Sequence, residues 1–228
     1  MNSLSIVVPA FNEARTIRGV VERLLALKLP VRLELLVVDD GSTDGTADAL
    51  SVLRDARLKV LRHPKNRGKG AAVRTALEQA TGDYLLVQDA DLEYDPEDIP
   101  RLLELAAAGA PAVYGSRILR TENPASYRRY YWGGRFISLW TSLLFLTRIT
   151  DEPTCYKLVR TELLRSLDLQ CTGFEFCPEV TAKLLKRGHL IVETPIRYRP
   201  RSIEEGKKIR WKDGVIALWT LLKIRLVG

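Results

Sequence analysis

The chain has 228 residues, of which 28% are charged and 46% hydrophobic, so its composition is that of a globular protein and excludes a disordered or fibrous one. This length suits one hydrophobic core, and we expect a single domain over residues 1–228. The net charge of +7 favours an anionic partner: a nucleotide, a nucleic acid or an acidic membrane surface. The three cysteines have no metal-ligand spacing, which argues against a zinc site or a disulfide framework and favours a reducing, cytoplasmic setting.

The first half of the chain alternates short apolar runs with segments of helical spacing. We predict strands at 4–10, 33–38, 58–61 and 84–88, and helices at 13–28, 43–54 and 70–80. The strands are continuously apolar, which indicates a Rossmann-like, mainly parallel sheet covered by helices on both faces. Polar turns follow these strands, and ligands of open α/β sheets bind at the carboxyl ends of the strands.

The second half is less regular. We predict strands at 112–114, 155–159 and 190–198, and helices at about 136–145, 176–186 and 211–225. A basic, aromatic stretch at 117–135 precedes the first of these helices, and a Lys/Arg-rich loop at 199–210 precedes the last. We expect the helices at 136–145 and 211–225 to be amphipathic.

Asp89 and Asp91 follow the fourth predicted strand and are two residues apart. In an extended backbone this spacing projects both carboxylates from one side, and Glu93 adds a third if the extended conformation continues. Hard oxygen ligands suit Mg²⁺ or Mn²⁺, which keep positions open for water and substrate phosphates. The simpler alternative is a solvated acidic turn that caps a helix, because Asp-x-Asp is frequent by chance.

Two other turns open predicted helices. At 39–46 one side chain suffices to cap the helix, which leaves a second carboxylate to accept hydrogen bonds from a nucleobase or ribose. The glycine-rich turn at 66–70 lacks the Walker A pattern, because Ala71 stands where Ser or Thr is required. Its glycines and Lys69 still predict an anion-friendly helix start.

Three segments, in this order, resemble the signature of family 2 glycosyltransferases: 8–13 (VPAFNE), 37–42 (VVDDGS) and 88–93 (QDADLE). Further segments are similar to the branch that transfers mannose or glucose to dolichyl-type polyprenyl phosphates: 115–117, 151–157 and 201–208. The resemblance implies the GT-A fold and an inverting transfer of a hexose from GDP-mannose or UDP-glucose to a polyprenyl phosphate. It also implies a nucleotide-sugar-binding half at 1–115 and an acceptor-binding half at 116–228.

The resemblance also implies roles for particular residues. Asp91 would hold the metal together with Glu93 and Asp89, although many relatives carry glutamine where this chain has Glu93. The residues expected to bind the nucleotide-sugar are Pro9, Ala10, Phe11, Glu13, Val37, Asp39, Lys69, Asp89, Ala90, Asp91, Arg117, Arg201 and Lys207.

Asp151 stands where family members often present a catalytic carboxylate, so we expect Asp151 and Asp91 to be the catalytic pair. A hydroxyl of a soluble sugar or glycan, the alternative acceptor, would need Asp151 as a general base. A polyprenyl phosphate is already anionic, so Asp151 would then position the sugar or the acceptor. A plain turn residue before Pro153 is the structural alternative.

The basic, aromatic stretch suits the headgroup region of an anionic bilayer. We expect Arg117, Arg128, Arg129 and Arg135 to meet the acceptor, and the amphipathic helices to lie in the membrane surface. The alternative is that these helices cover the sheet. No secretory signal and no apolar run of ~20 residues is visible, which predicts a peripheral protein on the cytoplasmic membrane face.

Other functions fit the sequence less well. Nothing resembles an RNA-binding sheet motif or a recognition helix, so nucleic acid is not an expected partner. A nucleotidyltransferase would need a glycine-rich loop with a basic triphosphate clamp between Ala10 and Arg18, and this loop is missing. A non-catalytic module that binds nucleotide-sugars at the membrane stays open, as does the oligomeric state.

Overall fold

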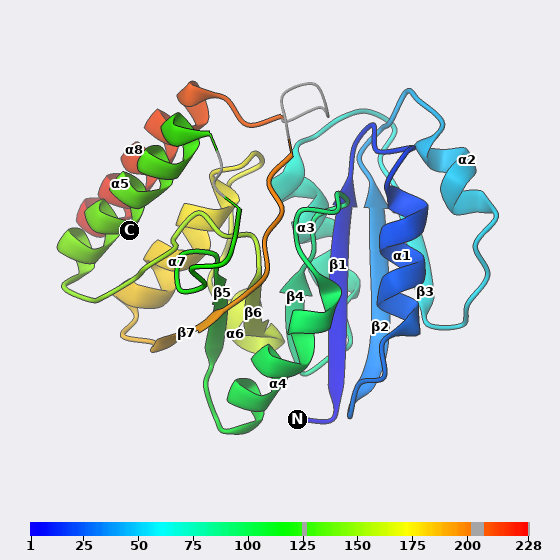
Figure 1. Ribbon diagram of the computed structural model, residues 1–228, viewed down its shortest axis with the longest axis horizontal. Helices are drawn as coiled ribbons and strands as arrows, with labels where there is room; N and C mark the ends of the chain where they lie inside the picture. Colours follow the sequence, from blue (N-terminus) through cyan, green and yellow to red (C-terminus); the bar gives the residue numbers. More distant parts are fainter. Residues whose placement is uncertain (125–126, 202–207, 228) are drawn as a thin grey trace.

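The protein is described by a computed structural model at residues 1–124, 127–201 and 208–227. At its centre is one seven-stranded sheet with the strand order β3-β2-β1-β4-β6-β5-β7 (Figure 1). The strands are β1 (Ser3–Ala10), β2 (Arg32–Asp39), β3 (Leu58–Arg62), β4 (Tyr84–Val87), β5 (Ala112–Ser116), β6 (Lys157–Arg160) and β7 (Ile191–Pro195). All the predicted strands are present, so this part of the prediction is confirmed.

The sheet is mainly parallel, as predicted, with one exception. Strands β3, β2, β1 and β4 are parallel neighbours, and β5 is parallel to β7. Strand β6 is antiparallel to both β4 and β5 and lies between them. Its reversed direction brings the loop that precedes it, with Asp151, to the edge where β1, β2, β4 and β5 end.

Helices cover both faces of the sheet, and a separate hydrophobic core lies under each face. One core contains apolar side chains of α1 (Ile17–Ala26), α2 (Thr46–Ser51) and α4 (Ile99–Ala107). The other contains those of α3 (Lys69–Gln79), α6 (Thr161–Ser166) and α7 (Phe176–Lys186). Helix α1 illustrates the cause, because Ile17, Val20, Val21 and Leu24 fall on one helical face and are buried.

Two helices lie outside this arrangement. Helices α5 (Arg128–Phe145) and α8 (Trp211–Val227) pack against each other at one end of the molecule, and α8 packs on α7 (Figure 1). Helix α5 begins eight residues earlier than predicted, so Arg128, Arg129 and Arg135 are helical. Most large apolar side chains of α5 and α8 are exposed, which contradicts the alternative that the apolar faces of these two helices cover the sheet. Within the described ranges, no helix is long and apolar enough to cross a membrane.

The sheet direction explains where the predicted site residues meet. The loops that follow β1, β2, β4 and β5 carry Glu13, Asp39, Asp91 and Arg117 to a common edge of the sheet. The segment after β7 reaches the same edge and adds Arg201, because β7 runs parallel to β5. The division into nucleotide-sugar and acceptor halves stays a prediction.

Candidate active site

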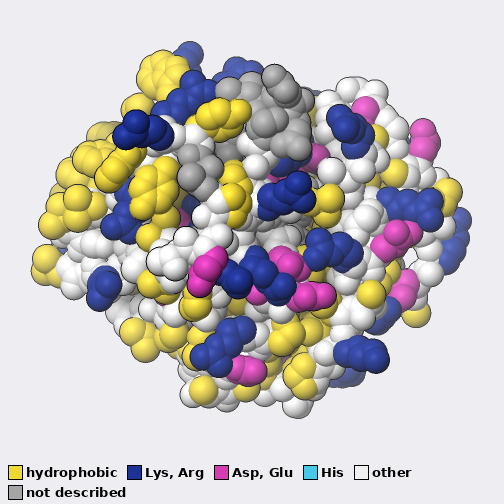
Figure 2. Space-filling model, viewed as in Figure 1, with side chains coloured by type: hydrophobic (Ala, Val, Ile, Leu, Met, Phe, Trp, Pro, Cys, Tyr) yellow, Lys and Arg dark blue, Asp and Glu magenta, His cyan; other side chains and the backbone are white. Residues whose placement is uncertain are grey.

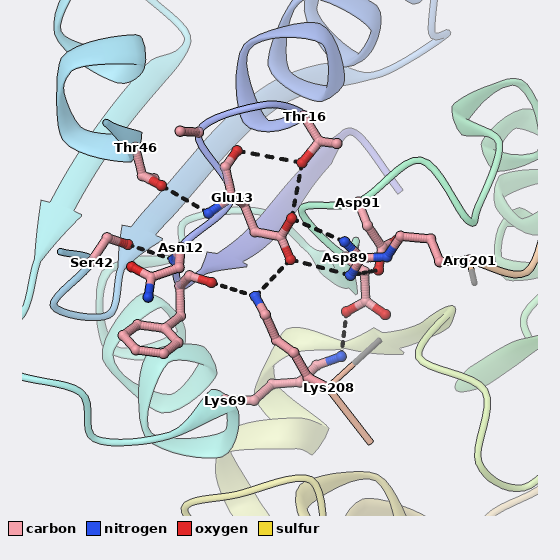
Figure 3. Close-up of polar contacts among 12 residues, drawn as sticks. Asn12, Glu13, Thr16, Ser42, Thr46, Lys69, Asp89, Asp91, Arg201 and Lys208 are labelled. Carbon is pink, nitrogen blue, oxygen red and sulfur yellow. Dashed lines mark hydrogen bonds and ion pairs between the residues drawn. The ribbon is translucent and has the colours of Figure 1, made fainter. Parts of the chain in front are cut away.

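Hydrogen bonds join the loops that follow β1 and β2. The backbone N–H of Asn12 donates to Ser42 Oγ over 2.9 Å, and the N–H of Thr43 donates to Asn12 Oδ1 over 2.8 Å. The N–H of Glu13 donates to Thr46 Oγ1 over 2.8 Å (Figure 3). Asn12 has a φ of 51°, a conformation that Asn tolerates better than most residues. These contacts fix the backbone on which Glu13 is presented.

The two adjacent aspartates at the end of β2 have different tasks. Asp40 accepts hydrogen bonds from the backbone N–H groups of Arg67 and Gly68, at 2.9 and 2.8 Å, and contacts His63 Nδ1 at 2.6 Å. It therefore holds the turn before α3.

Asp39 is fully buried and accepts one hydrogen bond, from the N–H of Ser42 at 2.9 Å. Its Oδ2 has no hydrogen-bond partner among the described residues, and Arg62 Nε lies 3.3 Å away as an ion pair. A cavity of about 410 Å³ lined by Asp39, Leu50, Val60 and Arg62 opens beside it. Asp39 thus retains an oxygen that can accept a further hydrogen bond, and its role in binding the nucleotide stays a prediction.

The start of α3 is not the open anion site that its glycines predict. The N–H groups of Gly70 and Ala71 donate to the carbonyl oxygens of Gly173 and Thr172, at 3.2 and 3.1 Å. A Cβ on Gly70 would lie 2.5 Å from the carbonyl oxygen of Cys171, so glycine allows this close approach. The expectation was wrong because a distant loop, invisible to local pattern, supplies the acceptors for the helix start.

The three carboxylates after β4 have different surroundings. Asp89 forms an ion pair with Lys69, whose Nζ also lies 2.8 Å from Cys155 Sγ. Burial alone would raise the pKa of Asp89, but the Lys69 cation lowers it overall. Burial, together with the charges of Asp89 and Glu93, raises the pKa of Asp91 to about 7. The ionised form of Asp91 is thus disfavoured here and would be favoured by an added cation.

A cation from the other half of the chain already meets these carboxylates. Arg201 lies between Glu13 and Asp91 (Figure 3), with its nitrogens 3.1 and 3.2 Å from Glu13 and 2.7 Å from Asp91. Lys208 Nζ lies 2.7 Å from Glu13 Oε1. Burial would raise the pKa of Glu13, but these two cations lower it overall. The second half therefore closes over the carboxylates of the first.

Arg117 and Asp151 form a bidentate ion pair. Arg117 Nη2 and Nε donate to the two carboxylate oxygens over 2.7 and 2.8 Å, and the Arg117 backbone N–H adds a third hydrogen bond of 2.8 Å. Asp151 is 2% exposed, and Glu193 accepts a hydrogen bond from its N–H. Burial would lower the pKa of Arg117, but Asp151 raises it well above the ordinary value. Both oxygens of Asp151 are therefore occupied.

The family of the chain is established by comparison with known proteins. The family model described as Glycosyl transferase family 2 matches residues 5–168, which is most of the chain. The chain is a family 2 glycosyltransferase. This confirms the family that the sequence motifs predict.

Two curated relatives carry names from the predicted branch of the family. The chain is 29% identical over 208 residues to the dolichol-phosphate mannosyltransferase of Pyrococcus furiosus, covering 90% of this chain and 58% of that protein. It is 31% identical over 245 residues to the undecaprenyl-phosphate mannosyltransferase of Micrococcus luteus, covering 96% of this chain and 97% of that protein. The chain thus spans little more than half of the Pyrococcus relative and nearly all of the Micrococcus one.

Solved structures confirm the GT-A fold. Glucosyl-3-phosphoglycerate synthase from Mycobacterium tuberculosis in complex with UDP has a TM-score of 0.76 at 21% identity, covering 100% of this chain and 81% of that chain. The same synthase in complex with Mn²⁺, UDP and phosphoglyceric acid has a TM-score of 0.72 at 21% identity, covering 100% and 80%. At this identity the likeness concerns the fold alone.

The structure brings most residues predicted from the glycosyltransferase resemblance to one edge of the sheet. Pro9, Ala10 and Val37 belong to the strands that frame this edge, and Ala90 is buried between the two aspartates. Phe11 follows β1 and has Lys208 Nζ 5.8 Å from its ring centroid.

Other predicted or functional residues lie elsewhere or were missed. Arg128, Arg129 and Arg135 are exposed on α5, unlike Arg117, which lies in the site. Lys207 lies outside the described residues. Sequence reasoning missed Lys208, which the same basic loop could have suggested, and Tyr198, which no motif marks.

The carboxylates fit a divalent cation in part. Within the described residues, no group of three or more His, Cys, Asp or Glu side chains is arranged to hold a metal ion. Asp89, expected as a third ligand, binds Lys69. Asp91 and Glu93 are the other two expected ligands, and Mg²⁺ is often bound by one or two carboxylates together with substrate phosphates and waters. The pKa of Asp91 is raised even though Arg201 lies 2.7 Å away, which is consistent with room for a further cation at this position.

Proposed function

We propose that this glycosyltransferase moves a hexose, with inversion, from a GDP-mannose or UDP-glucose type donor to a polyprenyl phosphate, and that it requires Mg²⁺ or Mn²⁺. The observation that carries the proposal is the carboxylate cluster at the sheet edge, with buried Asp91 at its centre and Arg201 2.7 Å from it. The names of the Pyrococcus and Micrococcus relatives support the polyprenyl-phosphate acceptor. The Mn²⁺ and UDP complexes of the synthase with the same fold support the metal and the donor class.

The loops after β1 and β2 bind the nucleoside. Asp39 contributes a buried carboxylate oxygen that lacks a hydrogen-bond partner among the described residues and can accept an N–H of a base or an O–H of a ribose. Asn12 and Ser42 hold both loops in place, so the nucleoside meets a preformed surface. Lys69 restrains Asp89 beside the position of the diphosphate.

The leaving group is a nucleoside diphosphate, on which negative charge grows as the glycosidic bond breaks. A divalent cation held by Asp91 and Glu93 would offset that charge when bound. Arg201 reaches the same position from the other half of the chain, 2.7 Å from Asp91, and adds a fixed positive charge.

The acceptor phosphate approaches the anomeric carbon from the side opposite the diphosphate, which gives inversion in one displacement. Arg117 binds this phosphate through the guanidinium N–H groups that Asp151 does not accept, since Asp151 takes two of the five donors. Asp151 orients Arg117 through its bidentate contact. The acceptor is already anionic, so Asp151 has no proton to remove, which agrees with both its oxygens being occupied.

The helices α5 and α8 bring the site to the lipid. Hydrophobic side chains gather over these helices in Figure 2, with Lys and Arg side chains around them. The exposed apolar residues of the two helices are Tyr131, Trp132, Phe136, Leu139, Leu143, Trp211, Val215, Ile216, Trp219, Leu226 and Val227. Apolar area of this kind, mixed with aromatic rings and cations, suits the interface of an anionic bilayer. We infer peripheral attachment through this α5–α8 face.

The experiment compares two acceptors that differ only in the phosphate. Purified protein with Mg²⁺ or Mn²⁺ is given labelled GDP-mannose or UDP-glucose and either a polyprenyl phosphate or the parent polyprenol. We expect glycolipid from the phosphate only, and none in the presence of EDTA. Equal transfer to the alcohol would contradict the acceptor, and full activity in EDTA would contradict the metal. Failure of both donors with both acceptors would contradict transferase activity of this type.

A further inference from the structure

Tyr198 lies just beyond β7 and contacts two parts of the site at once. Its hydroxyl donates a hydrogen bond to Glu93 Oε2 over 3.0 Å. The guanidinium carbon of Arg117 lies 5.0 Å from the centroid of its ring, within the range of a cation–π interaction. One side chain therefore touches both a carboxylate offered to the metal and the arginine offered to the acceptor.

The surroundings hold Tyr198 in one orientation. Its N–H donates to Asn123 Oδ1 over 3.0 Å, and its backbone bridges to that of Tyr94. The rings of Tyr198 and Tyr94 are 5.4 Å apart, and Tyr94 in turn stacks on Tyr156 at 5.2 Å. Tyr198 is 9% exposed. A carboxylate oxygen can only accept a hydrogen bond, so the phenol hydroxyl acts as the donor to Glu93.

Glu93 receives donors on both of its oxygens. While Tyr198 donates to Oε2, the backbone N–H of Arg201 donates to Oε1 over 2.6 Å. Donors of this kind fix the orientation of a carboxylate, and the loss of such donors beside a metal ligand typically weakens metal affinity by about 10- to 100-fold.

We propose that Tyr198 is a positioning residue with two separable parts: its hydroxyl orients Glu93 toward the divalent cation, and its ring supports Arg117 at the acceptor phosphate. This inference rests on the proposed function, since it assumes the metal role of Glu93 and the acceptor role of Arg117. It adds a physical link between the donor and acceptor sides, which approach each other here. Removing the hydroxyl and removing the ring should then have different effects.

Tyr198→Phe removes the hydroxyl and keeps the ring. In the presence of a nucleoside diphosphate, we expect Mn²⁺ binding, measured by the electron paramagnetic resonance of free Mn²⁺, to weaken by about 10- to 100-fold. The KM for polyprenyl phosphate, measured at saturating Mn²⁺, should not change. A residue that served only the fold would give no such split.

Tyr198→Leu removes the ring as well. We expect the same loss of Mn²⁺ affinity and, in addition, a rise of about five- to thirty-fold in the KM for polyprenyl phosphate, the range expected for a partly desolvated cation–π contact. Thermal unfolding checks that this variant folds. If it does not fold, Tyr198→Phe tests the proposal alone.

Tyr156→Phe is the matched control, because Tyr156 is also a buried tyrosine in the same stack but donates to the backbone oxygen of Asp95. It should leave Mn²⁺ affinity and acceptor KM unchanged. Equal Mn²⁺ binding by the wild type and Tyr198→Phe would overturn the proposal for Tyr198 and leave the proposed function intact. Absence of Mn²⁺ binding by the wild type itself would overturn both this proposal and the metal role.

Discussion

The loops after β1 and β2 and the α5–α8 face differ in how their side chains are used. In the loops, Glu13 donates a hydrogen bond to a neighbouring loop, and Asn12 and Asp40 accept hydrogen bonds from neighbouring loops. On the α5–α8 face, Trp132 is 63% exposed and Leu143 is 62% exposed, although both belong to a regular helix. The hydrogen bonds of the two loops are therefore made within the chain, whereas the α5–α8 face exposes apolar surface to water.

This difference separates two kinds of binding. A preorganised polar surface can bind a small charged ligand with little reorganisation, so changes there should alter catalysis. An exposed apolar surface gains free energy only when something else covers it, so changes there should alter attachment and leave chemistry intact. Substitutions in each region test whether catalysis and attachment separate in this way.

The largest effect should come from Asp91→Asn. The substitution removes the carboxylate at the centre of the cluster and with it a ligand of the proposed metal. We expect kcat/KM for the donor to fall by about 1,000-fold, equivalent to ~4 kcal/mol of transition-state stabilisation. The measurement is steady-state transfer at saturating Mg²⁺. The control is Asp83→Asn, because Asp83 lies at the opposite end of β4 and accepts N–H groups of Asn2 and Ser3. Activity of Asp91→Asn within tenfold of the control would refute the metal role.

A smaller but more selective effect should follow from changes on the α5–α8 face. Replacing Trp132, Leu139 and Leu143 by serine removes exposed apolar area without touching the site. We expect binding to anionic vesicles, measured by co-sedimentation, to weaken by at least about tenfold, since each large side chain contributes on the order of 1 kcal/mol or more when covered. Transfer to a short-chain acceptor in solution should be unchanged. Val52→Ser is the control, because this valine is 61% exposed and lies outside α5 and α8. Equal loss in the control would argue against a specific face.

Asp151→Asn should have a modest effect on turnover. The variant loses part of the bidentate contact to Arg117, so we expect a higher KM for the acceptor and a fall in kcat of less than about tenfold. A general base for a hydroxyl acceptor would instead contribute about 100- to 10,000-fold. Removing one partner of a buried pair also costs about 3 kcal/mol of stability, so thermal unfolding accompanies the assay. Near-total loss of kcat in folded protein would favour the hydroxyl acceptor.

The sequence predicted the strands and the residues at their ends well, because apolar runs and polar turns are local patterns. The position of β6 was not predicted, since strand order depends on pairing between segments that are distant in the chain. Helix α6 was also missed as a separate element. The hydrogen bonds from the start of α3 to the Thr172 and Gly173 carbonyls also join segments that are distant in the chain, so they were not predicted either.

The site was predictable where residues act through motifs and not where they act through long-range contacts. Asp39, Asp91 and Arg117 stand in recognisable segments and lie at one edge, as expected. The pairing of Arg201 with Glu13 joins residues 188 positions apart, and the contact of Tyr198 with Glu93 joins residues 105 positions apart. No spacing rule connects such pairs, because the fold alone determines their distance.

The smallest effect concerns the pH dependence of stability and tests the carboxylate cluster without any assay of transfer. The pKa of Asp91 is raised to about 7 in the folded protein, against about 3.9 in an unfolded chain. Between these values the folded state holds a proton that the unfolded state has lost, so the contribution of Asp91 to stability falls as pH rises. Asp91→Asn cannot ionise, so its Tm in EDTA relative to the wild type should rise by several degrees from pH 4 to pH 8, since ~1 kcal/mol shifts Tm by about 2–4 °C at this size.

Asp83→Asn should show the opposite sign. The N–H groups of Asn2 and Ser3 lower the pKa of Asp83, so this carboxylate stabilises the fold more at high pH than at low pH. Adding Mn²⁺ with a nucleoside diphosphate at pH 8 should then raise the Tm of the wild type and of Asp83→Asn but not that of Asp91→Asn. A Tm difference for Asp91→Asn that does not change with pH would mean that the cluster carries no unbalanced negative charge. The loop after β4 would then need no cation to balance its carboxylates. Like the loops after β1 and β2, and unlike the α5–α8 face, it would be complete within the chain.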